Sequence, residues 1–274
     1  MPKMEVPGRM GWHWDAVTQS LDLCVGNRIV RKFGASHITT ATTRTTSTTQ
    51  LYALGTPLQI DDGCVYHYCR AGSALTRFVA GGNDDQWGLT NEAADATSAV
   101  GSTSVTIAET AATADSLVGG ILTIFTSPLQ VRRIVSNAAS DGTSTVCTID
   151  MALDTAVTTA STWITGYYNI YYDVTAPNLS SGDEAYLTFV AVPVCTVASG
   201  SYFWGQTWGP CYGVAAQTVP GSAANQREVY FGDDGNLWDY GDLTAGTGAQ
   251  YAGYLLPRTG SGAGDQLYML QLAP

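Results

Sequence analysis

Three histidines and six cysteines are the side chains of this sequence best suited to catalysis or metal binding. The histidines are His13, His37 and His67, and a nucleophile needs such a base within hydrogen-bonding reach. The sequence contains no Gly-x-Ser-x-Gly elbow, no His-Glu-x-x-His motif and no phosphate-binding glycine loop. We therefore predict no catalytic residue, no enzymatic activity and no cofactor.

Two stretches carry residue types that bind metals. Cys64-x-x-His67-x-Cys69 has zinc ligands, but alternation along a strand places Cys64 on the face opposite the other two, and no second ligand pair follows. Ordinary packing is therefore expected there. The stretch FGDDGNLWDYGD, residues 231–242, lacks the spacing and the closing Glu of a calcium loop, so we expect a polar β-turn followed by a loop. No metal is predicted.

The aromatic stretch SGSYFWGQTWGPCYGVAA, residues 199–216, contains no charged residue. As a strand it would project Tyr202, Trp204, Gln206 and Trp208 to one face and Phe203, Gly205 and Thr207 to the other. We expect Gly209-Pro210 to end this strand. One face would meet the domain's own core, and the other a second sheet or a neighbouring subunit, with carbohydrate stacking as a third alternative.

The elements that position these residues are predicted to be short antiparallel strands. Helical periodicity is hard to find, whereas β-branched or aromatic runs bounded by Gly, Asn, Asp and Pro recur, for example GGILTIF, STVCTIDM, EAYLTFVAVPV and QLYMLQLAP. The fold class is therefore expected to be all-β, with β-barrel or β-sandwich domains.

Residues 1–50 differ from the rest of the chain. They contain both lysines and four arginines, and eight of the eleven residues from Thr39 to Thr49 are threonine. Such a segment is too polar to build its own core, so we predict an extended N-terminal arm that becomes ordered by contact with a partner. The alternative is that it packs back on its own domain as extra strands. Its candidate interface residues are Trp12, Trp14, Arg9, Arg28, Arg31 and Arg44.

Composition narrows the partners and the compartment. Charged residues make up only 13% of the chain, the net charge is −11 and no basic block is present, so nucleic acid is not an expected partner. No apolar run has the length of a signal peptide or of a membrane span, so no membrane is expected either. The six cysteines should be mostly reduced and buried, as in a protein left in a cytosol.

Four stretches together resemble a family of virion proteins of tailed bacteriophages, the capsid decoration or cement proteins. They are LGTPLQIDDGCVYHYCRAGSAL, GSTSVTIAETAATADSLVGGILTIFTSPLQVRRIVSN, SYFWGQTWGPC and AGYLLPRTGSGAGDQLYMLQLAP, and the resemblance covers residues 51–274. It implies a β-barrel or β-sandwich, binding to the major capsid protein on the capsid surface, assembly in the host cytoplasm, no enzymatic activity and no cofactor. The family's clustering around symmetry axes suggests contacts between copies, with trimers as one form.

The expected organisation has four parts. Residues 1–50 are the arm, 51–98 a first β segment, 99–177 a middle β-hairpin domain, and 178–274 a C-terminal barrel or sandwich segment that packs with 51–98. A tail-fibre or receptor-binding protein of the virion is the alternative function, because it shares the Thr- and Gly-rich all-β composition. A secreted lectin-like module would need an export signal and, in general, disulfides.

Overall fold

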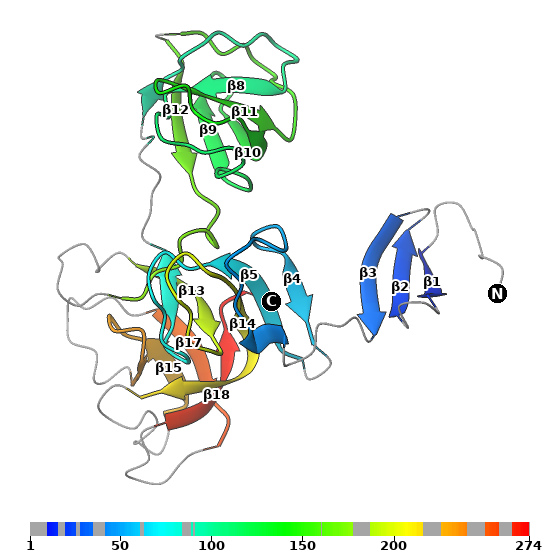
Figure 1. Ribbon diagram of the computed structural model, residues 1–274, viewed down its shortest axis with the longest axis vertical. Coiled ribbons are helices and arrows are strands. Elements are labelled where there is room, and N and C mark those ends of the chain that lie inside the picture. Colours follow the sequence, from blue (N-terminus) through cyan, green and yellow to red (C-terminus); the bar gives the residue numbers. More distant parts are fainter. Residues whose placement is uncertain are drawn as a thin grey trace. The chain divides into compact units, whose positions relative to one another are not determined.

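The structure is a computed structural model, shown in Figure 1. It describes residues 10–15, 20–25, 28–34, 42–60, 63–83, 89, 91–159, 161–177, 187–215, 226–239, 250–257 and 265–273, with the backbone alone up to residue 34. These residues form antiparallel β-strands and a short 3-10 helix, which confirms the predicted all-β class. In this part of the chain no helix has the length and apolar content to cross a membrane.

The first 45 residues belong to a compact unit separate from residues 46–274. Its elements are β1 (Met10–Asp15), β2 (Ser20–Val25), β3 (Arg28–Gly34) and the 3-10 helix η1 (Thr42–Arg44). Strand β2 pairs with β1 and β3, and the register sets Trp12 opposite Leu23 and Trp14 opposite Leu21. The arm is therefore a paired sheet rather than a single extended chain, because its short alternating runs can satisfy one another's backbone groups.

Residues 89–167 contain a curled sheet with the strand order β7-β12-β9-β10-β11-β8. Its strands are β7 (Glu92–Ala93), β8 (Ser104–Ile107), β9 (Ile121–Phe125), β10 (Gln130–Asn137), β11 (Thr145–Ile149) and β12 (Trp163–Tyr167). Just after β7, Ala94 N donates to Thr162 O (2.8 Å) and Asp95 N donates to Thr106 O (3.3 Å). The second bond joins the segment after β7 to β8, the strand at the other end of the sheet. We call this curled half-barrel of strands the barrel.

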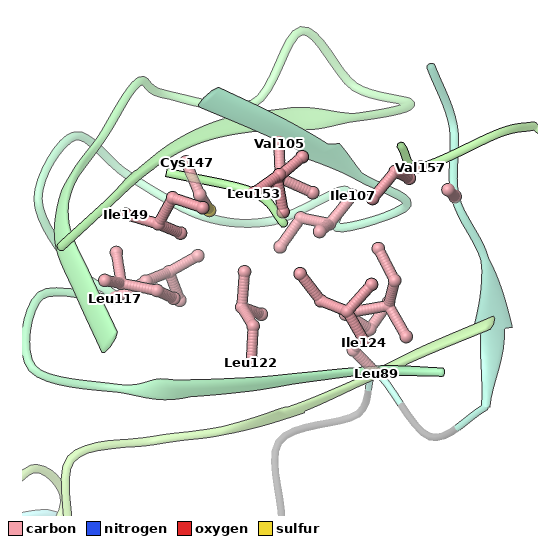
Figure 2. Packing of buried hydrophobic residues seen from close by; sticks show 13 residues of the cluster. Leu89, Val105, Ile107, Leu117, Leu122, Ile124, Cys147, Ile149, Leu153 and Val157 are labelled. Carbon is pink, nitrogen blue, oxygen red and sulfur yellow. The ribbon is translucent and has the colours of Figure 1, made fainter. Parts of the chain in front are cut away.

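Inward-facing side chains alternate along the barrel strands and fill the interior. The buried apolar cluster comprises Leu89, Ala94, Val105, Ile107, Leu117, Leu122, Ile124, Ile134, Cys147, Ile149, Leu153, Val157 and Ile164. In Figure 2 the side chains of β8 and β11 face those of β9 across this core. The barrel therefore has an apolar core of its own.

Buried amides lie at the two ends of β10. The Gln130 side chain accepts from Asp154 N (2.7 Å) and donates to Thr155 O (3.0 Å). The Asn137 side chain accepts from Leu117 N (2.9 Å) and donates to Thr113 O (2.8 Å). Each amide satisfies backbone groups of loops that have no strand partner, so hydrogen bonds hold the ends of the barrel in addition to the apolar packing of its core.

The rest of residues 46–274 is organised around a sheet with the order β16-β15-β17-β18-β14-β13-β6, in which β5 also pairs with β14 and β4 with β5. Its strands are β4 (Pro57–Gln59), β5 (Val65–Arg70), β6 (Gly81–Asn83), β13 (Thr188–Pro193), β14 (Tyr202–Val214), β15 (Glu228–Phe231), β16 (Leu237–Trp238), β17 (Gln250–Leu255) and β18 (Asp265–Gln271). We call it the C-terminal sheet. Two buried apolar clusters pack against it.

The barrel is inserted into the C-terminal sheet between β6 and β13, which pair with each other. Gly82 N donates to Thr175 O (3.0 Å) and Thr175 N to Gly82 O (2.8 Å), so the chain returns from the barrel beside the strand from which it left. The expected middle domain, 99–177, differs at both ends. Its sheet begins earlier, at Glu92, because β7 is too short to give a periodic signal, and Thr175 already belongs to the C-terminal sheet.

Candidate interaction surfaces

His67 lies inside the C-terminal sheet, on β5. Its Nδ1 hydrogen-bonds Thr207 Oγ1 on β14 (3.0 Å), and its ring stacks on Tyr171 with the ring centroids 4.7 Å apart. Burial lowers the pKa of His67, and the Thr207 side chain is fully buried. Because these two residues are 140 positions apart, no local motif indicates the pair. The pair joins two strands and is not open to a substrate.

Cys64 and Cys69 do not converge with His67 on a common point. The Cys69 thiol donates to the carbonyl oxygen of His67 (3.3 Å), and the Cys64 thiol to that of Pro210 (3.6 Å). Burial raises the pKa of Cys69, which favours the thiol over the metal-binding thiolate. Among the described residues no group of three or more His, Cys, Asp or Glu side chains is placed to hold a metal ion. The cysteines whose side chains the structure describes are free thiols, buried at Cys64, Cys69, Cys147 and Cys211 and half-buried at Cys195.

The acidic stretch forms a turn after β15, as the sequence predicts, but the turn is followed by the short strand β16 rather than directly by a loop. Asp234 accepts hydrogen bonds from Asn236 N (3.0 Å) and Trp238 Nε1 (2.9 Å), and Gly235 adopts a φ of +71°. The carboxylate is therefore used to close the β15–β16 hairpin. The last residues of the stretch, 240–242, lie outside the described residues.

The aromatic stretch forms the first part of β14. Phe203 and Trp204 are buried, whereas Tyr202 and Trp208 are half-buried. The indole of Trp204 contacts the rings of Tyr68 (5.0 Å between centroids) and Tyr52 (5.2 Å). The prediction that a second sheet or a neighbouring subunit covers the Trp204 face is therefore wrong. The chain's own segment 47–60 covers it, because its backbone is fixed to β5 and β14.

Gly209-Pro210 does not end this strand, contrary to expectation, since β14 runs on to Val214. At this point the strand instead changes its partner: the residues before Gly209 pair with β5, and those after it pair with β18. Gly209 has a φ of +98°, and an added Cβ would lie 2.9 Å from Cys64 Cα. A glycine allows the local distortion at which one neighbouring strand replaces the other.

The candidate interface residues of the arm are distributed over its elements. Trp12 and Trp14 lie on β1, Arg28 and Arg31 on β3, and Arg9 lies outside the described residues. Arg44 ends η1 and is exposed. The segment that follows belongs to the C-terminal sheet, since Ser47 and Tyr202 exchange backbone hydrogen bonds of 3.0 and 2.7 Å. The arm is therefore shorter than the predicted 1–50.

One side of the barrel presents apolar side chains to solvent. Trp163 on β12 lies directly opposite Phe125 on β9, and the register of β9 with β10 continues this row to Leu129. We call this surface the barrel platform, and its members are Phe125, Leu129, Val131, Trp163 and Tyr167, each 42–55% exposed. The Thr165–Thr123 pair lies between the Trp163 row and Tyr167. Exposed apolar side chains gathered on one side of a sheet are one mark of a binding site.

A second apolar surface lies on the outer face of the C-terminal sheet. One row crosses β14 and β18 with Tyr212 opposite Leu267, whose backbone accepts a hydrogen bond from Leu256 N (3.1 Å). The next row sets Tyr254 opposite Met269, and Met269 opposite Pro210. We call this surface the tyrosine face, with the members Tyr212, Tyr254, Leu256, Leu267, Met269 and Pro210. None of the six side chains is charged.

Both surfaces are absent from the sequence-based site residues, although a signal for them exists. GGILTIF and QLYMLQLAP are apolar at both odd and even positions, so each strand has two faces to cover. The prediction of cover on both faces concerns only the tryptophan-rich strand. Comparisons with protein-family models, curated proteins and solved structures give no match.

Proposed function

We propose that this chain is a structural protein of a tailed-bacteriophage virion that binds the outside of the capsid and stabilises it. Its partners are the major capsid protein and further copies of itself, its place is the capsid surface, and it assembles in the host cytoplasm. It catalyses no reaction and takes no cofactor. The resemblance of residues 51–274 to capsid decoration proteins is the reason for choosing a capsid as the partner.

The barrel platform is the observation that carries the proposal. Trp163, Phe125 and Leu129 form a continuous row across the outer side of a barrel whose interior is already filled. Exposing this apolar area costs solubility, and burying it against a protein surface recovers about 25 cal/mol per Å². Aromatic residues of this kind are enriched at the centres of protein interfaces.

The charge division of the chain supports a second point of attachment. Residues 1–45 carry six basic and three acidic side chains, a formal charge of +3, whereas residues 46–274 carry six basic and twenty acidic ones, a formal charge of −14. A basic unit joined to an acidic body is suited to pairing its arginines with carboxylates on an acidic neighbour. In this proposal Arg28, Arg31 and Arg44 fasten the molecule to the capsid or to an adjacent copy.

Capsids stripped of the native protein test the platform. Leu129→Lys places a charge in the platform at a solvent-exposed position, so the variant should fold but fill the capsid sites at least about tenfold less tightly than wild type, as expected for an interface residue. Val100→Lys, at an exposed position outside the platform, is the control and should bind like wild type. Equal binding by Leu129→Lys would exclude the platform as the docking surface.

Deleting residues 1–45 tests the N-terminal unit. This cut leaves Ser47 paired with Tyr202, so the remaining body should keep its melting temperature but lose capsid occupancy. Full occupancy without the unit would contradict its fastening role.

The number of copies in purified particles distinguishes a head protein from a tail protein, since hundreds of copies indicate the capsid and a few to tens indicate the alternative tail-fibre protein.

A further inference from the structure

The tyrosine face is bounded by opposite charges at its two sides. On one side Glu228 of β15 lies opposite Tyr254 of β17 in the register. On the other side the Phe78 ring meets Tyr212 edge-on, with 4.9 Å between ring centroids, and the Arg77 guanidinium lies 5.9 Å from the centre of the Phe78 ring. The surface thus runs from an anion, across uncharged side chains, to a cation.

The order of the strands determines where the negative and the positive ends of this surface lie. From Glu228 to Arg77 the surface crosses β15, β17, β18 and β14 in turn, and these strands are neighbours in the sheet. Both charged residues are exposed. The Glu228 carboxylate also accepts a hydrogen bond from the Tyr230 hydroxyl (2.9 Å), which holds it beside the aromatic surface.

A second molecule facing the first, related by a two-fold axis parallel to the strands, presents the same strands in reverse order. Its Arg77 then lies at the same edge of the contact as Glu228 of the first molecule, one row of residues away along the strands, and its Glu228 lies likewise at the edge of Arg77. The uncharged centre, with Leu267 and Met269 on β18, packs on itself, as isologous contacts require. A contact with an apolar core and a charged rim is the usual anatomy of a protein interface.

Two copies of this acidic chain repel each other less when they meet through the tyrosine face than through other parts of the surface. Each chain carries −11, so two copies that meet through an average part of the acidic surface bring like charges together. The six members of the tyrosine face are uncharged, and the rim pairs opposite charges. We infer that the tyrosine face is the contact between two copies of this chain, formed around a two-fold axis with reciprocal Arg77–Glu228 pairs.

Sedimentation velocity over a range of concentrations tests this inference on the full chain. Wild type should form a dimer. Leu267→Lys should weaken the dimer by roughly thirtyfold or more, the loss typical of a central interface residue. Leu267 is 41% exposed, so the variant is expected to fold, and circular dichroism checks this. Val100→Lys, at an exposed position outside both apolar surfaces, is the matched control and should dimerise like wild type.

The rim pairs allow a test that leaves the apolar centre intact. Arg77→Glu and Glu228→Arg should each weaken the dimer by about five- to tenfold, and the double exchange should restore it, because each charge meets its opposite on the other copy. A chain that stays monomeric at all concentrations, forms trimers, or shows no restoration in the double variant would overturn the inference. A monomer whose Leu267→Lys variant fails to bind capsids would instead assign the face to the capsid.

Discussion

Replacing Trp204 by alanine tests how the aromatic stretch is stabilised. The indole is 3% exposed and contacts the rings of Tyr68 and Tyr52, with ring centroids 5.0 and 5.2 Å away. Truncating a buried tryptophan costs about 3–5 kcal/mol, of which each aromatic pair contributes about 0.5–1.5 kcal/mol beyond the area buried. For a unit the size of residues 46–274, the melting temperature should fall by about 6–20 °C.

The assay is thermal unfolding followed by near-ultraviolet circular dichroism, with a double-mutant cycle between Trp204→Ala and Tyr52→Ala. Because the two rings touch, the cycle should show a coupling free energy of about 0.5–1.5 kcal/mol. Trp208→Ala is the comparison and should cost less, since that indole is half-buried. A melting temperature of Trp204→Ala within about 2 °C of wild type, or additive losses in the cycle, would refute the assignment of segment 47–60 as the cover.

Two further changes probe the same part of the fold. Burial lowers the pKa of His67 below its ordinary 6.5, so near and below that pH the unfolded chain binds more protons than the folded one, and the free energy of unfolding should fall on acidification. His67→Asn keeps a polar partner for Thr207 but does not titrate. This variant should therefore show a weaker dependence of the melting temperature on pH in this range. Gly205→Ala would place its Cβ 2.5 Å from Ala191 Cβ, and such overpacking should cost about 1–3 kcal/mol in urea unfolding. Adding Ala191→Gly should recover part of that loss, and no recovery would argue against the close approach.

The all-β class was predictable because it depends on local patterns. Runs such as GGILTIF and STVCTIDM, each bounded by turn residues, became β9 and β11. The alternation of Phe203 and Trp204 between two faces of one strand is equally local. The polar turn at Asp234 follows from side-chain hydrogen bonds within four residues.

Non-local pairings could not be predicted in this way. The cover of Trp204 comes from residues on the other side of the inserted barrel in sequence, and the hydrogen bond of His67 with Thr207 spans 140 positions. The β14 strand continues through Gly209-Pro210 because β18 replaces β5 as its neighbouring strand. Local turn propensity cannot predict such a change of partner. The two exposed surfaces likewise need the strand order before rows of residues can be recognised.

The mutual hydrogen bonds of Gly82 and Thr175 fix the two ends of the barrel at a single point of the C-terminal sheet. The entropy needed to close a loop grows only with the logarithm of its length, so the sheet tolerates a long or a short connection between these residues almost equally. Insertions into the barrel, its replacement by another domain or its deletion should therefore leave the strand register of the C-terminal sheet unchanged. The side chains of the barrel platform and those of the tyrosine face, which belong to the two sides of this junction, can therefore change independently of one another.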